Sequence, residues 1–87
     1  MNTFDLQIVT PDGVFYNGKA QKVIVRAVTG DLCILSGHAD LVSPVGKGDI
    51  RMVTENGDIK TAFCEGGLLS VKNGAAKIVS DSFEWKV

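Results

Sequence analysis

The sequence of 87 residues has little of what carries chemistry: one histidine, two cysteines, two prolines and one tryptophan. Cys33 and Cys64 are too few for a disulfide-dense secreted scaffold, so we expect reduced thiols, with one bridge as the alternative. The net charge of −1 lacks the positive excess of a nucleic-acid-binding protein. The longest uncharged apolar stretch, Leu32 to Leu35, is far shorter than the ~18–20 residues of a membrane span.

The length predicts one domain over residues 1–87, because folded domains usually need roughly 50–200 residues. An enzyme with a separate substrate domain is excluded by size. The first five residues, Met1 to Asp5, lack the basic region and apolar run of a signal peptide. We therefore expect a soluble intracellular protein without a targeting peptide.

Turn signals recur along almost the whole chain and separate runs of about four to eight residues, the usual length of strands. They include three Asn-Gly pairs, which are predicted to reverse the chain at Asn17-Gly18, Asn56-Gly57 (as a type I′ hairpin) and Asn73-Gly74. The runs between them alternate apolar and polar residues. Examples are Phe4/Leu6/Ile8, Val23/Val25/Ala27, Ile50/Met52/Thr54 and Phe83/Trp85/Val87. No apolar stripe of helical period persists, so the sequence predicts an all-β sandwich or barrel.

The common catalytic and ligand motifs are missing. His38 is the only imidazole, and no Gly-x-Ser-x-Gly nucleophile elbow precedes it. Cys33, Cys64 and His38 lack zinc-site spacing. Gly46-Lys47-Gly48 resembles a phosphate loop only superficially, since a Walker sequence needs glycine at position 41 and Ser or Thr at 48. We expect no metal, no cofactor and no nucleotide site.

One ordering of short motifs is more specific than a generic sandwich. In chain order the motifs are Phe4-x-Leu6-x-Ile8-Val9-Thr10-Pro11-Asp12-Gly13, Phe15-x-x-Gly18-x-Ala20, Gly30-Asp31-Leu32-x-Ile34-Leu35-x-Gly37-His38-Ala39-x-Leu41, Gly48-x-Ile50-Arg51, Gly66-Gly67-Leu68-Leu69-x-Val71 and Ile78-Val79-Ser80-Asp81. Together they resemble the N-terminal β-sandwich domain of the epsilon subunit of F-type ATP synthase (delta in mitochondria). The resemblance covers essentially the whole chain.

This resemblance implies a sandwich of two roughly five-stranded, mainly antiparallel sheets. It also implies a non-catalytic rotor subunit of the central stalk, which binds the gamma subunit and rests on the polar loops of the c-ring. Such a subunit couples ATP synthesis to proton or sodium transport. It belongs to a peripheral complex on the cytoplasmic face of the bacterial plasma membrane and does not itself enter the bilayer.

The resemblance also suggests contact residues. By position, Asp31 in the Gly30-Asp31-Leu32 turn matches the acidic loop that meets the c-ring. Gly37-His38-Ala39 and Leu41-Val42 match a neighbouring segment, expected at the same end of the sandwich near gamma and the ring. The predicted partner-binding set is Asp31, Leu32, Gly37, His38, Ala39, Leu41 and Val42.

Two features depart from the family pattern. Asp40 stands where the family usually has proline, so we expect a less rigid turn after His38. The chain stops at Val87, where the family ordinarily continues into a helical hairpin associated with inhibition of ATP hydrolysis and, in some members, with ATP binding. Neither activity is expected of these residues, and an end in mid-alternation favours truncation.

Two other functions stay open on sequence grounds. A free-standing ligand-binding sandwich, such as a carbohydrate-binding module, would need an exposed aromatic platform, for which Tyr16 and Trp85 are the candidates. An enzyme that uses His38 with a nearby aspartate is the weaker alternative.

Overall fold

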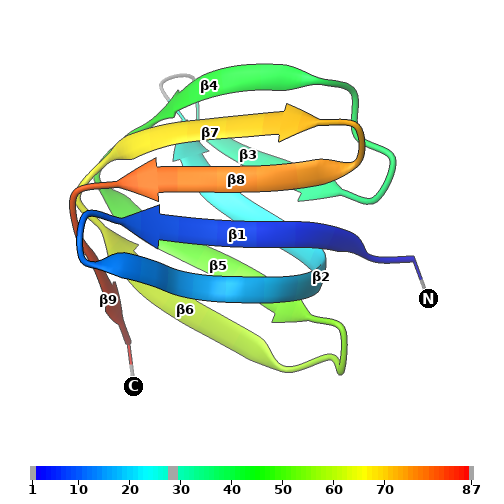
Figure 1. Cartoon of the computed structure of the whole chain (residues 1–87), viewed down its shortest axis with the longest axis horizontal. Helices are drawn as coiled ribbons and strands as arrows, with labels where there is room; N and C mark the ends of the chain where they lie inside the picture. The colour runs from blue at the N-terminus through cyan, green and yellow to red at the C-terminus, as the bar shows by residue number, and fades with distance from the viewer. Residues whose placement is uncertain (1, 28–29, 87) are drawn as a thin grey trace.

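The computed structural model describes residues 2–27 and 30–86, so Val87, the last residue of the predicted final alternation, lies outside it. The described residues form nine strands and no helix, which confirms the predicted all-β class (Figure 1). The strands are β1 (Phe4–Thr10), β2 (Gly13–Ala27), β3 (Gly30–Leu35), β4 (Leu41–Val45), β5 (Gly48–Thr54), β6 (Ile59–Cys64), β7 (Gly67–Lys72), β8 (Ala75–Ser80) and β9 (Phe83–Trp85).

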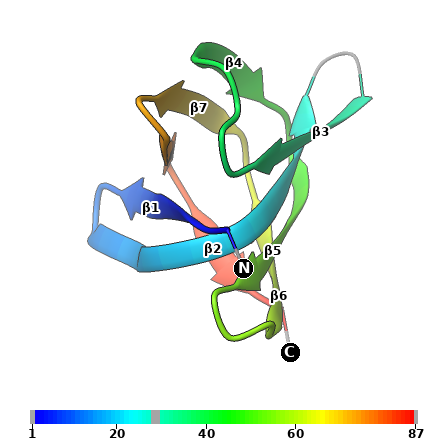
Figure 2. The same cartoon turned by 90° about the vertical axis from the view of Figure 1, so that its right-hand side faces the viewer.

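The strands form two layers that share β2. Hydrogen bonds link them in the order β4-β7-β8-β1-β2-β5-β6-β9, with β3 also paired to β2. The first half of β2 pairs with β1, and the second half pairs with β3 and β5. Figure 2 shows β2 curving from β1 on one side to β3 on the other. The front layer is therefore β4, β7, β8, β1 and the first half of β2, and the rear layer is β3, the second half of β2, β5, β6 and β9.

This arrangement confirms the predicted sandwich of two roughly five-stranded sheets, with β2 counted in both. All pairings are antiparallel except the one between β1 and β8, which brings the first long strand beside the last one. The turns β1–β2, β4–β5, β6–β7 and β8–β9 lie at one end of the sandwich, at the left in Figure 1, and β3 begins toward the same end. We call this the β1–β2 end.

The core follows the alternation predicted from sequence. Leu6 and Ile8 of β1, Val23 and Val25 of β2, and Met52 of β5 are almost fully buried. Successive side chains of a strand point to opposite faces, so one residue in two enters the space between the layers. Each fully buried aliphatic side chain contributes about 1.5–3 kcal/mol relative to exposure, which makes this inner set the main stabilising term.

A β-bulge shapes the open side of the sandwich. The register between β1 and β2 shifts between Ile8 and Val9, and Phe15 is the extra residue. The shift lets both Phe15 and Tyr16 turn toward β9, where Phe15 stacks on Trp85 at 5.0 Å between ring centroids. Tyr16 meets the same indole edge-on at 6.5 Å. These rings close the gap between the free edges of the two layers.

The Asn-Gly pairs behave in three different ways. Asn73 and Gly74 have φ of 52° and 79°, and Lys72 pairs with Ala75, which is the geometry of a two-residue type I′ hairpin. The predicted reversal there is confirmed. At Asn56-Gly57, however, only Gly57 has positive φ (89°), so the predicted type I′ turn is wrong.

The hydrogen bond that closes this turn explains why Asn56 is not left-handed. Thr54 N donates to Asp58 O at 2.8 Å, so residues 55–57 lie inside the closing hydrogen bond of the β5–β6 turn, and only one of them needs a left-handed conformation. At Asn17-Gly18 the predicted reversal is also wrong, because both residues lie inside β2 and pair with β1. A Cβ on Gly18 would lie 3.2 Å from the Tyr16 hydroxyl, so this glycine makes room for packing.

Candidate protein-docking surface

The outer face of the front layer carries a row of uncharged apolar side chains across all five strands. Cross-strand register places them side by side: Pro44 of β4, Leu68 of β7, Val79 of β8, Val9 of β1 and Val14 of β2. Val14, Leu68 and Val79 are 60%, 47% and 46% exposed, respectively. We call these five residues the apolar row. It lies near the β1–β2 end.

Core packing does not account for the apolar side chains of the row. Leu69, Ile78 and Ile8, the chain neighbours of three row residues, are the ones that point inward and are buried. In a sheet with one solvated face, inward apolar side chains normally alternate with outward polar ones. Along the row, the outward side chains are apolar as well. Contiguous exposed apolar surface on a soluble domain marks an interaction site. None of the five row residues belongs to the partner-binding set predicted from the sequence.

Away from the row, the front face is polar and charged. The adjacent positions include Ser70, Lys77 and Gln7, and Val42 at the edge. Farther on, Lys19 Nζ lies 2.9 Å from Asp5 Oδ1. This hydrogen bond and the charge of Asp5 raise the pKa of Lys19 above its ordinary value.

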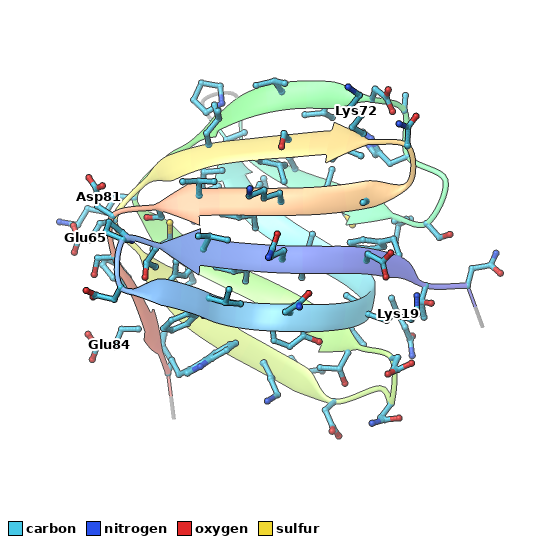
Figure 3. The ribbon with its side chains drawn as sticks, viewed as in Figure 1. Lys19, Glu65, Lys72, Asp81 and Glu84 are labelled. Atoms are coloured by element: carbon cyan, nitrogen blue, oxygen red, sulfur yellow. The ribbon has the colours of Figure 1, made fainter. Side chains whose placement is uncertain are left out.

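Carboxylates lie beyond the apolar row at the β1–β2 end, beside Lys47, and the opposite end carries lysines together with carboxylates such as Asp5. Figure 3 shows Glu65, Asp81 and Glu84 at the left, near the β1–β2 end, and Lys72 and Lys19 toward the right. Glu65 is only loosely paired, since its Oε2 lies 3.9 Å from Lys47 Nζ. The apolar row is thus bordered by carboxylates on one side and by polar residues and lysines on the other. A partner that places apolar side chains on the row and cations at its acidic border would be complementary.

The predicted contact residues fall into two groups. Asp31 is opposite Arg26 at the β1–β2 end, and its Oδ1 lies 3.0 Å from Arg26 Nε. Gly37, His38 and Ala39 lie in the loop after β3, at the far end of that strand. A strand rises about 3.3 Å per residue, so the six residues of β3 separate the groups by roughly 20 Å. The prediction that they share one end is wrong.

The loop after β3 is held in place by two hydrogen bonds. His38 N donates to Leu35 O at 3.2 Å, and Asn73 N donates to Asp40 Oδ1 at 3.1 Å. The expected looseness from the missing proline is thus offset by a bond from Asp40 to the β7–β8 turn. His38 Nδ1 donates to Ala39 O at 2.7 Å, so this ring nitrogen is engaged by the backbone.

The remaining predicted contact residues differ in exposure. Leu32 and Leu41 are half-buried and pack against the core. Val42 is 69% exposed and borders the apolar row from β4, so it is the member of the second group closest to the candidate surface. Gly37 and Ala39 are exposed in the loop.

Three other features were considered in the described residues: a metal site, a membrane-spanning helix and a carbohydrate platform. Among residues 2–27 and 30–86, no group of three His, Cys, Asp or Glu side chains could hold a metal ion. That same part of the chain contains no helix capable of crossing a bilayer. Trp85, a candidate carbohydrate platform, has Phe15 stacked on its ring and Lys60 Nζ 5.5 Å from its centroid. These contacts cover part of the aromatic surface that a sugar would need, and Trp85 stays 37% exposed.

Comparison with known proteins gives the family. Residues 3–86 match the family model described as the beta-sandwich domain of the ATP synthase delta/epsilon chain. The chain belongs to this family. It is 34% identical to the ATP synthase epsilon chain of Caldicellulosiruptor saccharolyticus over 98% of its own length, and 39% identical to that of Clostridium kluyveri over 92%. It spans 61% of the length of each of these relatives.

Solved structures share the fold of this delta/epsilon domain. A chain of the Euglena gracilis mitochondrial ATP synthase, in a structure of its OSCP, F1 and c-ring, superposes with a TM-score of 0.90 at 19% identity. The match covers 95% of this chain and 53% of that one. A chain of the Tetrahymena thermophila mitochondrial ATP synthase central stalk and c-ring gives 0.77 at 13% identity, covering 91% and 63%.

Proposed function

We propose that the chain is the docking domain of an ATP synthase epsilon chain and has a structural rather than catalytic role. In this proposal it binds the gamma subunit through the apolar row, with Val42 at the margin. The observation that carries the proposal is the row itself: a charge-free strip across five strands in a family whose members are named as ATP synthase chains.

The β1–β2 end is proposed to face the c-ring. Asp31 lies at this end, as do the turns that carry Glu65 and Asp81. Exposed carboxylates of this kind steer association and fix register more than they add affinity. The packed apolar surface therefore has to transmit the torque, because a single rim contact contributes little. Gly37, His38 and Ala39 are proposed only as peripheral gamma contacts, since they lie at the opposite end.

In this role the domain would turn with the rotor and help couple ATP synthesis to proton or sodium movement. Its place would be the cytoplasmic face of the bacterial membrane, as a peripheral part of the complex. The experiment is co-expression of the tagged chain with gamma and c subunits of the same source. We expect gamma and the c-ring to co-purify with it. A monodisperse chain without measurable affinity for gamma would overturn the proposal.

A further inference from the structure

The backbone and stem of Arg26 lie against the β4–β5 turn. Its carbonyl accepts a hydrogen bond from Gly46 N at 2.7 Å. A Cβ added to Gly46 would lie 3.6 Å from Arg26 Cγ, and one added to Gly48 would lie 3.7 Å from Arg26 Cβ. The Gly46-Lys47-Gly48 turn, which lacks the spacing of a Walker sequence, therefore lies directly against the stem of Arg26.

The head of the same side chain is directed at Asp31. The two residues are direct cross-strand partners in β2 and β3, and Arg26 Nε lies 3.0 Å from Asp31 Oδ1. Both side chains are more than half exposed, so the pair adds little to stability. Its effect is geometric: one carboxylate oxygen is occupied, and the planar guanidinium fixes the direction of the other.

We infer that Arg26 is a positioning residue, cradled by the Gly46-Lys47-Gly48 turn, that orients the Asp31 carboxylate for a partner. The inference rests on the proposed c-ring contact of Asp31 and adds to it. The partner meets an oriented ion pair at this corner rather than a free acid. Arg51, one strand away on the same face, lines the same small hollow with Asp31 and Asp49 and offers an equal charge without the bond at 3.0 Å.

The test measures binding of the chain to a detergent-solubilised complex of gamma and the c-ring. We expect Arg26→Gln to weaken binding about threefold to tenfold, the loss expected for one oriented charge-assisted hydrogen bond. Arg51→Gln, with the same charge change, is expected to stay within about twofold because it removes only a screened charge. Arg26→Lys, which retains the charge without the planar Nε–H donor, should fall between them. On an Asp31→Asn background, Arg26→Gln should add nothing.

A second readout reports positioning directly. The Arg26 Nε–H signal in NMR spectra should be shifted and slowly exchanging in the wild-type chain and should lose both properties in Asp31→Asn. Equal effects of Arg26→Gln and Arg51→Gln, or full additivity with Asp31→Asn, would overturn the inference while the docking role of Asp31 stands. A neutral Asp31→Asn would instead remove that docking role, and the inference with it.

Discussion

The two outer faces of this sandwich cover the same core but differ in chemistry. The front face carries the apolar row without a charged member. The rear face mixes ionic and apolar groups: Arg26 pairs with Asp31, and Lys86 with Asp49 at 3.1 Å. Its exposed apolar residues, Leu35 and Ile59, are separated by Lys22 and Val53. Since both layers bury their inner residues equally well, folding alone does not require the row. Under the proposed function, the difference between the faces reflects binding of gamma to the front face.

A charged substitution in the apolar row should have the largest effect on gamma binding. Leu68→Asp places a charge inside the row, between Pro44 and Val79, and we expect gamma binding to fall by at least about 30-fold, the loss of an interface hot spot. The free energy of unfolding should change by only about 0.5 kcal/mol, because the side chain is already exposed. Isothermal calorimetry and chemical denaturation measure the two quantities.

Ile59→Asp is the matched control on the rear face. It introduces the same charge at a more exposed apolar position of β6, and gamma binding should stay within about twofold. Equal losses in the two variants would mean that the faces do not differ in function.

Charge reversal at the β1–β2 end should have the next largest effect. Asp31→Lys removes the bond to Arg26 and leaves two cations facing each other, so we expect several-fold weaker docking on the c-ring and reduced ATP-driven ion pumping in reconstituted enzyme. The loss should shrink at high salt, because charges beyond about 10 Å are screened at 0.1 M. The control variant Asp58→Lys, in the β5–β6 turn at the opposite end of the sandwich, should leave ATP-driven pumping unchanged. Unchanged pumping in Asp31→Lys would contradict the assignment.

The loop after β3 offers a smaller test. Asp40→Ala removes the acceptor for Asn73 N and should lower the free energy of unfolding by about 0.5–1.5 kcal/mol. Hydrogen exchange at the Asn73 amide should accelerate, while Asp40→Asn, which retains Oδ1, should behave like the wild type. Gamma binding should change little in both, because this loop lies far from the apolar row. A loss of gamma binding as large as that expected for Leu68→Asp would indicate that gamma docks at this end instead.

The smallest effect is expected at high pH. Partial burial, followed by the charge of Glu55, raises the pKa of Tyr16, and the bond to Asp5 raises that of Lys19. A pKa that is higher in the folded state means that this stability is complete below the unfolded pKa and is lost as pH rises through the folded one. Stability should therefore decline above about pH 10, and less steeply in Tyr16→Phe. An unchanged slope in that variant would remove Tyr16 from the explanation.

Much of the fold could be predicted from the sequence because strand alternation is local. The buried positions of β1 and β5 follow directly from it. Asn-Gly pairs were less reliable, since the same dipeptide forms a type I′ turn at Asn73, part of a three-residue loop at Asn56 and a continuous strand at Asn17. Pairing with neighbouring strands, which is not encoded locally, decides among these outcomes.

The candidate site was harder to predict for the same reason. Leu68-Leu69 and Ile78-Val79 look like continuous apolar runs, and only the cross-strand register shows that Leu68 and Val79 meet on the outside. Apolar residues at both odd and even positions of one strand were the available signal. The family resemblance placed Asp31 and His38 at the same end of the sandwich, but a whole strand separates them.

The most direct test is a methyl NMR titration of the chain with purified gamma subunit. The methyl groups of Leu68, Val79, Val9 and Val14 should shift or broaden on binding, whereas those of Ile59 and Val53 on the rear face should keep their positions. Perturbation of Ile59 and Val53 with an unaffected apolar row would show that gamma binds the other face, and would contradict the proposed docking surface.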